Sequence, residues 1–187
     1  MTDDGTIFSH GFHNIQPHLT TKQRYKIDRG IKIARNISSG THRFTEIFQG
    51  FEKLDTVKKV FGSRTEDELS SLNVEVFPQE GFMGVSDEDG HIFASQQYLN
   101  GGEEWSVYLD VVHELVHVKQ FKDGRELFDK KFDYVDRPTE IEAYRVGAME
   151  ARRIGLDDHA IFAYLEVPWI SKEEHQRLAK ACGLKID

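Results

Sequence analysis

Apolar and polar residues repeat along the chain in two different periods, and together they predict an α+β fold. Residues 20–37 are expected to form a helix, with Tyr25, Ile27, Ile31 and Ile33 on its inner face. Apolar residues recur every three or four positions over residues 44–61, which is typical of helices that pack one face against a core. Gly40 is expected to end the first of these helices. Residues 72–76 alternate between apolar and polar, which predicts a strand that ends at Pro78.

A hairpin is predicted next. Residues 82–86 and 91–95 are two extended stretches separated by Asp87-Glu88-Asp89-Gly90, and an Asp-Gly step is common in hairpin turns. Together with residues 72–76, these stretches predict a small, mainly antiparallel sheet of three or four strands. The acidic run lacks the spaced oxygen ligands of a calcium loop, so it is expected to be an exposed turn.

The second half of the chain is expected to be helical. Residues 103–122 form the most continuous apolar stretch, which predicts a helix that is buried on most sides and ends at Asp123-Gly124. The highly charged residues 124–137 are expected to form a loop that holds a short helix. Another helix should run from Pro138 to Ile154, where Gly155 follows. Two shorter helices are expected near residues 157–165 and 171–182.

Length and composition favour one domain over residues 1–187. A chain of 187 residues with 39% hydrophobic content can bury a single sizeable core. The polar segment 1–18 carries His10, His13 and His18 and shows no sustained periodicity. This segment is expected to be a flexible arm.

Charge and cysteine content narrow the classes of function. The formal net charge of -8 argues against a nucleic-acid partner, because nucleic-acid sites gather Lys and Arg. The sequence has neither an apolar run of the signal-peptide type nor a membrane-spanning stretch, so the protein is expected in the cytoplasm without a membrane partner. Cys182 is the only cysteine, which excludes an internal disulfide and a zinc site built from thiolates. The sequence does not indicate an oligomeric state.

The pentad His113-Glu114-Leu115-Val116-His117 is the one motif that implies a specific chemistry. Positions i and i+4 of a helix project from the same face, so the two imidazoles can hold one Zn²⁺ ion. Glu114 then falls beside the metal, where its carboxylate can take a proton from a water molecule and later return it. Two histidines and a glutamate in a buried helix also need polar partners, and a metal ion supplies one. A pair of core histidines without a metal is the alternative interpretation.

A catalytic zinc site usually has three protein ligands. A metzincin would place a glycine and a histidine where this chain has Gln120 and Asp123, which excludes that class. The next helix offers Glu140 or Glu142. Glu140 shares a face with small residues suited to close helix packing, whereas Glu142 lies on a charged face and fits a capping box begun by Thr139. Glu140 is therefore the favoured third ligand, with Glu142 as the alternative.

The pentad and the later run Glu140-Ile141-Glu142-Ala143 resemble the gluzincin metallopeptidases, and they are most similar to minimal gluzincins and ImmA/IrrE-type peptidases. The resemblance covers about residues 80–155, the expected metallopeptidase core. It implies a minimal zincin-like fold in which a small sheet packs on the active helix. It also implies that His113, His117 and Glu140 bind zinc and that Glu114 is the general base.

The same resemblance implies further residues around the zinc. Many members use a tyrosine or histidine to stabilise the oxyanion, and Tyr134 and Tyr144 are the candidates here. In families where an aspartate four residues past the glutamate orients a zinc histidine, this chain has Tyr144 instead. An orienting acid would have to come from elsewhere, and Asp110 and Asp136 are the candidates.

Two functions of different classes follow. The first is a zinc peptidase that cuts an extended peptide or a flexible segment of a protein, held against an edge strand that residues 82–86 or 91–95 would supply. The second is a catalytically silent, zinc-binding regulatory or scaffold protein on the same frame, whose site residues 1–18 could occlude. A helical binding module without a metal leaves the buried pentad unexplained.

Overall fold

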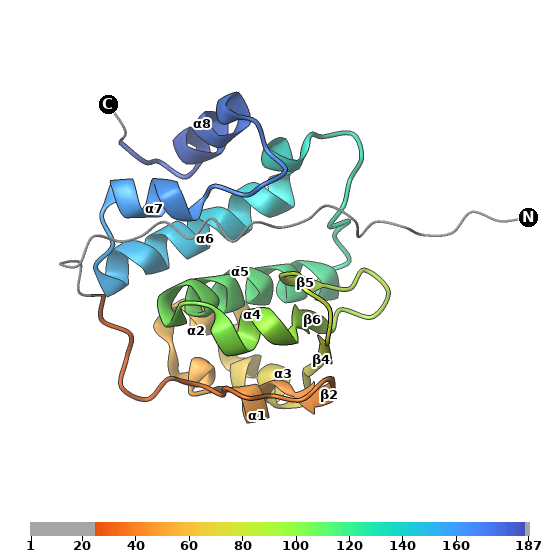
Figure 1. Cartoon of the computed structure of the whole chain (residues 1–187). Coiled ribbons are helices and arrows are strands. Elements are labelled where there is room, and N and C mark those ends of the chain that lie inside the picture. The colour runs from red at the N-terminus through yellow and green to blue at the C-terminus, as the bar shows by residue number, and fades with distance from the viewer. Residues whose placement is uncertain (1–24, 186–187) are drawn as a thin grey trace, which may run out of the picture.

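Helix α5 (Glu104–Lys122) runs through the middle of the molecule in this computed structural model, which describes residues 25–185 (Figure 1). Thirteen of its nineteen residues are buried, as expected of a helix that is apolar on nearly every side. Helix α6 (Pro138–Ile154) packs against α5. Helices α7 (Asp158–Tyr164) and α8 (Lys172–Ala181) pack against α6 and lie beyond it. The sheet and the preceding helices lie on the opposite side of α5. The fold is α+β, and these four helices lie where the sequence predicts them.

The ends of the two long helices follow the local sequence. Both are followed by a glycine with positive φ, Gly124 at 74° and Gly155 at 103°, and the next N–H groups return to carbonyls of the last turn. Helix α6 begins at Pro138, which lacks the N–H that a first helical residue would leave unpaired. The predicted cap at Thr139 is therefore wrong: Arg137 is the N-cap, and the Thr139 hydroxyl donates to Leu127 O at 3.1 Å.

The four-stranded sheet has the order β2-β4-β6-β5. Its strands are β2 (Gly40–Arg43), β4 (Asn73–Phe77), β5 (Met83–Val85) and β6 (Ile92–Ser95). Strands β5 and β6 form the predicted hairpin, but β6 also pairs in parallel with β4. Two of the three pairings are antiparallel, so the sheet is mainly antiparallel, as predicted. The parallel pairing of β4 with β6 makes it mixed, and local alternation does not reveal it, because it does not show which distant strand a hairpin joins. Strand β5 is an edge strand, and it lies against α5.

The helix predicted over residues 20–37 is wrong where the structure describes it. Residues 25–37 form turns and the short strand β1 (Lys32–Ile33), which pairs with β3 (Phe48–Gln49). The apolar side chains here are spaced two or four residues apart and pack as partly buried residues against the core; they are Tyr25, Ile27, Ile31, Ile33 and Ile37. Even-numbered spacing of this kind keeps side chains on one face of an extended chain.

The helix predicted over residues 44–61 is broken into pieces. The pieces are α1 (Phe44–Ile47), β3, the 3₁₀ turn η1 (Phe51–Lys53) and α2 (Asp55–Phe61). The break falls at Gly50, whose φ of 87° is left-handed. A Cβ at Gly50 would lie 2.3 Å from the carbonyl oxygen of Gly30, so only glycine fits where these two segments meet. The apolar residues still build the core, as predicted.

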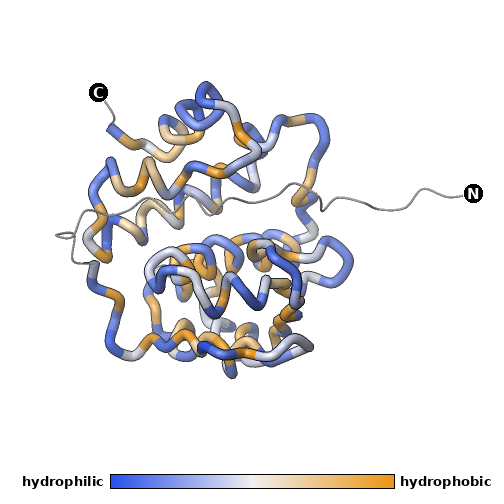
Figure 2. The backbone as a smooth tube through the Cα atoms, in the orientation of Figure 1, coloured by the Kyte–Doolittle hydropathy of each residue, from blue (hydrophilic) through white to orange (hydrophobic). Residues whose placement is uncertain are grey.

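Three short elements and one strand are not anticipated by the apolar pattern. They are β2, η2 (Gly62–Arg64), α3 (Thr65–Ser71) and α4 (Gln96–Gly101). All are short and several are largely polar, as the hydropathy colouring shows (Figure 2). Helix α4 owes its start to Ser95, whose hydroxyl accepts from the N–H of Tyr98.

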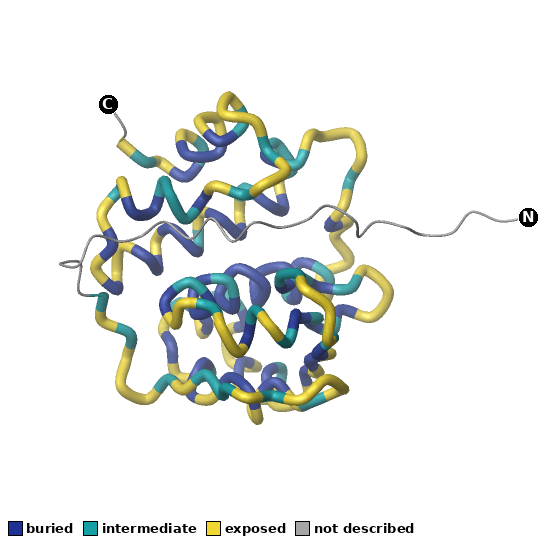
Figure 3. Tube along the Cα trace, in the orientation of Figure 1, coloured by how far each residue is buried: buried dark blue, intermediate teal, exposed yellow. Residues whose placement is uncertain are grey.

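The buried residues form one hydrophobic cluster that reaches from α1 to α8 (Figure 3). Within the described residues 25–185, each helix is too short or too polar to span a bilayer. The predicted arm at residues 1–18, with its three histidines, lies outside the described residues.

Candidate metal centre

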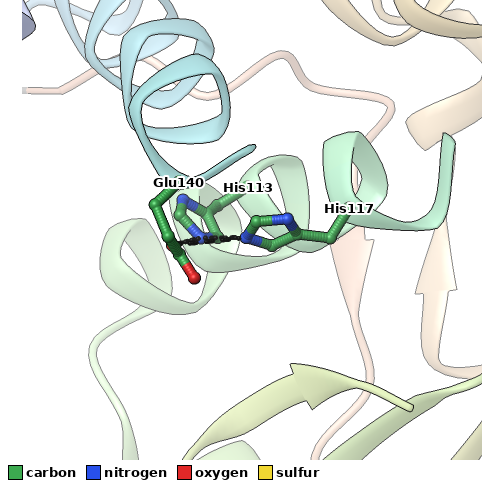
Figure 4. A group of neighbouring side chains, drawn as sticks. All are labelled: His113, His117 and Glu140. Carbon is green, nitrogen blue, oxygen red and sulfur yellow. Dashed lines mark hydrogen bonds and ion pairs between the residues drawn. The ribbon is translucent and has the colours of Figure 1, made fainter. Parts of the chain in front are cut away.

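Two helices that are distant in sequence bring His113, His117 and Glu140 together (Figure 4). The histidines lie one turn apart on α5, and Glu140 lies in the first turn of α6, which packs against it. All three side chains are buried, with 7%, 6% and 4% of their surfaces exposed. Figure 4 shows the imidazole nitrogens and the carboxylate turned toward one another.

The ligand atoms are spaced close to what one metal ion requires. The Nε2 atoms of His113 and His117 are 3.0 Å apart, and Glu140 Oε2 lies 3.5 Å from the first and 3.4 Å from the second. Ligands about 2.0–2.2 Å from a tetrahedral cation lie about 3.3–3.6 Å from one another. The group is therefore able to hold a metal ion.

The hydrogen bonding of the group also fits a cation. Glu140 Oε2 is buried and has no hydrogen-bond partner among the residues that the structure describes. A buried polar atom left unpaired costs about 1–3 kcal/mol, more when it is charged. A cation held by the two imidazoles would satisfy this oxygen.

The carboxylate of Glu140 controls the charge of the group. Burial alone would raise the pKa of Glu140, but the two histidines outweigh it and lower the pKa to about 2. Burial alone would lower the pKa of His117, but Glu140 outweighs it and raises the pKa to about 9. Burial dominates at His113 and lowers its pKa. The site therefore joins a carboxylate to one histidine that readily holds a proton and one that stays neutral.

Glu114 is buried on α5 between the two histidines in sequence, with 7% of its surface exposed. Burial is the largest cause that raises its pKa, to about 8, and Glu140 and Asp110 act in the same direction. A carboxyl group with a pKa near neutrality can both accept and return a proton. This property suits the role that the sequence predicts for Glu114.

Of the two candidate tyrosines, Tyr144 lies beside His113 and Tyr134 lies beside Tyr144. The ring of Tyr144 packs against that of His113 with a centroid distance of 4.4 Å, and the hydroxyls of Tyr134 and Tyr144 are 2.7 Å apart. Burial, with Glu140 nearby, raises the pKa of both tyrosines well above the usual value. Both hydroxyls therefore keep their protons: one donates to the other within the pair, and the second hydrogen is left to donate to another acceptor.

Glu142, the alternative ligand, points elsewhere. Its carboxylate accepts hydrogen bonds from Arg125 and from Gln120 Nε2, the latter at 3.0 Å. Helical phase explains the difference from Glu140, because residues two positions apart on a helix lie on nearly opposite sides. The third member of the group is thus Glu140.

The proposed orienting acids hydrogen-bond to residues other than the histidines. Asp110 accepts hydrogen bonds from Tyr98 and Tyr164, and Asp136 accepts one from Arg177 at 2.9 Å. The residue that does contact a histidine is Gln120, whose Oε1 lies 2.8 Å from His117 Nδ1. Sequence reasoning missed Gln120, although its position three residues after His117 places both on one helix face.

Comparison of the chain with protein-family models, curated proteins and solved structures finds no match of any of the three kinds. The geometry of this site is therefore the basis for the function of the chain.

Proposed function

We propose that this chain is a zinc-dependent metallopeptidase. The observation that carries the proposal is the buried convergence of two imidazole nitrogens and one carboxylate oxygen, separated by 3.0–3.5 Å, beside a buried glutamate. Two nitrogen ligands and one oxygen ligand are a donor set that catalytic zinc sites use, and they leave a fourth position for a water molecule.

Each residue of the site has a distinct task in peptide hydrolysis. Zinc held by His113, His117 and Glu140 would lower the pKa of a water ligand and polarise the substrate carbonyl. The Glu114 carboxylate accepts a proton from the attacking water and passes it to the leaving amine nitrogen. The hydroxyls of Tyr134 and Tyr144 keep their protons, and the one that accepts the hydrogen bond within the pair can donate its own hydrogen to the oxyanion that develops on the carbonyl.

Strand β5 supports a peptide or a flexible protein segment as the substrate. Phe82 O accepts from Ser95 N, and Ser86 N donates to His91 O, so these residues face β6. The alternation of an antiparallel pair then turns the backbone N–H and C=O groups of Met83 and Val85 toward the open edge of the sheet. An extended peptide can add to this edge as a further strand. Of the two stretches that could supply an edge, 82–86 fits and 91–95 lies inside the sheet.

Aromatic side chains link this edge to the tyrosine pair. The ring of Trp169 lies 5.5 Å from Phe82 and 5.7 Å from Tyr134, measured between centroids, and 46% of its surface is exposed. A peptide along β5 would meet this aromatic surface close to the metal group. Apolar side chains in the substrate would therefore gain contact area there.

Metal analysis tests the first step of the proposal. Protein purified without a histidine tag should contain about one zinc ion per chain, and His117→Ala should contain none, because two ligands hold zinc far more weakly than three. Elemental analysis makes the measurement. No metal in the wild-type protein, even after zinc is supplied, would end the peptidase hypothesis.

Hydrolysis of unfolded proteins tests the second step. Glu114→Gln should keep its zinc and lose activity by about 10²–10⁴-fold, because the base is removed while the ligands remain. Glu104→Gln, an exposed position on the same helix, is the matched control and should keep full activity. Loss of zinc in Glu114→Gln would contradict the role given to Glu114.

A catalytically silent, zinc-binding regulatory or scaffold protein is the second candidate. The observation that favours it is burial: none of His113, His117, Glu114 and Glu140 exposes more than 7% of its surface. Structural zinc sites are closed in this way. A zinc-loaded protein that stays inactive, with no gain after deletion of residues 1–18, would favour this candidate over the peptidase.

A further inference from the structure

We infer that Gln120 is a positioning residue for the metal centre: it orients His117 and ties it to the helix that carries Glu140. This inference rests on the metal site of the proposed function but not on peptide hydrolysis. Gln120 is 2% exposed and uses both ends of its amide within the protein.

The orientation of the amide follows from its partners. Gln120 Nε2 lies 3.0 Å from the carbonyl oxygen of Thr139 and 3.0 Å from a carboxylate oxygen of Glu142. Both partners are acceptors, so the amide end that faces them must be the NH₂ group, which has two hydrogens to donate. The other end, Oε1, can then only accept, and it faces His117 Nδ1 at 2.8 Å.

This bond decides which nitrogen of His117 is available to a metal. Because Oε1 accepts, Nδ1 carries a hydrogen whether the ring is charged or neutral. When the ring is neutral, the lone pair is on Nε2, the atom that faces His113 and Glu140. Hydrogen bonds of this kind fix both the tautomer and the rotation of a metal-binding imidazole.

The same amide joins the two helices that carry the ligands. Gln120 and His117 are on α5, whereas Thr139 and Glu142 flank Glu140 in the first turns of α6. Glu142 is itself held by the guanidinium of Arg125, the second residue after the C-cap of α5. One side chain therefore sets the ring of His117 and the place of Glu140 relative to each other.

Zinc affinity of the full-length protein provides the first test, with zinc ions alone in competition with a chelating dye. Gln120→Leu should bind zinc about 10–100-fold more weakly than wild type, because His117 loses its fixed orientation. Gln96→Leu is the matched control: it also removes an amide that donates to a backbone carbonyl, that of Ile37 at 2.8 Å, but in α4, and it should bind as wild type does. Equal affinity in Gln120→Leu and wild type would overturn the inference.

Two further variants keep the test decisive if Gln120→Leu folds poorly. Gln120→Met has nearly the length of glutamine without its polar atoms, and it should show the same loss of affinity. Glu142→Ala changes an exposed residue and removes one of the two acceptors, so it should show a smaller loss. Wild-type zinc affinity in Gln120→Met or in Glu142→Ala would count against the inference.

The tautomer of His117 gives a readout that needs neither metal nor activity. Nitrogen NMR of the metal-free protein at about pH 10, where the ring is neutral, should place the hydrogen on Nδ1 in wild type. In Gln120→Leu the hydrogen should move largely to Nε2, as in a free histidine ring. A wild-type protein that binds no zinc but shows the Nδ1 tautomer would reject the proposed function and support the orienting role. The Nε2 tautomer in wild type would reject the role itself.

Discussion

At the scale of single residues, His117 should bind metal in competition with a proton. Its pKa is raised to about 9: burial works against the charge, but Glu140 outweighs burial. At pH 7 the metal-free ring is therefore mostly protonated, and a metal ion must displace that proton. Zinc affinity should rise about tenfold per pH unit between pH 7 and 9 and level off above. Dye competition at a series of pH values measures this slope, and an affinity that is flat over this range would contradict it.

The two glutamates of α6 should differ in what they contribute to metal binding. Glu140→Ala removes a ligand oxygen, whereas Glu142→Ala removes only a partner of Gln120. Zinc affinity should therefore fall by much more than 10-fold in the first variant, and by about 10-fold or less in the second. The same dye competition measures both. The reverse order would move the third ligand to Glu142.

The sequence predicts the metal-binding residues of the site better than it predicts the residues that hydrogen-bond to them. The spacing of His113 and His117 and the helical phase of Glu140 are local properties of two helices, and the structure brings these three residues together. The partners of Gln120 are a carbonyl and a carboxylate on another helix. No pattern within α5 specifies them, so the sequence instead suggested acids that turn out to pair with tyrosines and an arginine.

At the scale of elements, the break at Gly50 should be essential to the N-terminal part of the fold. Gly50→Ala puts a Cβ on a residue with φ 87°, 2.3 Å from the oxygen of Gly30. The left-handed backbone alone costs about 1–2 kcal/mol, and the close approach adds to it. Thermal unfolding should show Tm lower by about 4–8 °C for a loss of about 2 kcal/mol.

Gly147→Ala is the matched control for this element. Gly147 lies inside α6, and a Cβ there would have no atom within 4 Å apart from neighbours along the helix itself. Alanine favours a helix interior by about 0.5–1 kcal/mol over glycine, so Tm should rise slightly. Equal destabilisation by both substitutions would show that the close approach at Gly50 is not the cause.

A helix or strand is predictable from the sequence where a single local pattern of apolar residues determines it. The helices α5 and α6 follow from long apolar runs bounded by glycine, and β4, β5 and β6 follow from alternation and a turn. The prediction failed over residues 25–37, where the even apolar spacing also fits an extended chain, and at the break between α1 and α2, where the path depends on the close approach of Gly30 and Gly50. The parallel pairing of β4 with β6 is a long-range choice of the same kind.

At the scale of the whole molecule, a metal should join the two sides of the fold. His113 and His117 belong to the central helix α5, and Glu140 belongs to α6, which covers one side of it (Figure 1). A ligand that binds only the folded protein stabilises it by about 2.7 kcal/mol at a hundredfold excess over its Kd. For a chain of this size that corresponds to about 5–11 °C in Tm.

Removal of zinc with a chelator should therefore lower Tm by this amount, and zinc added back should restore it. His117→Ala controls for zinc bound elsewhere, for example by exposed histidines, and its Tm should not respond to zinc or chelator. Hydrogen exchange locates the effect: the amides of the first turns of α6 should exchange more slowly with zinc, because opening there would break the bond to Glu140. A rise in Tm that persists in His117→Ala would mean that the metal acts at another site. A rise without slower exchange at the start of α6 would mean that Glu140 does not carry the link between the two sides.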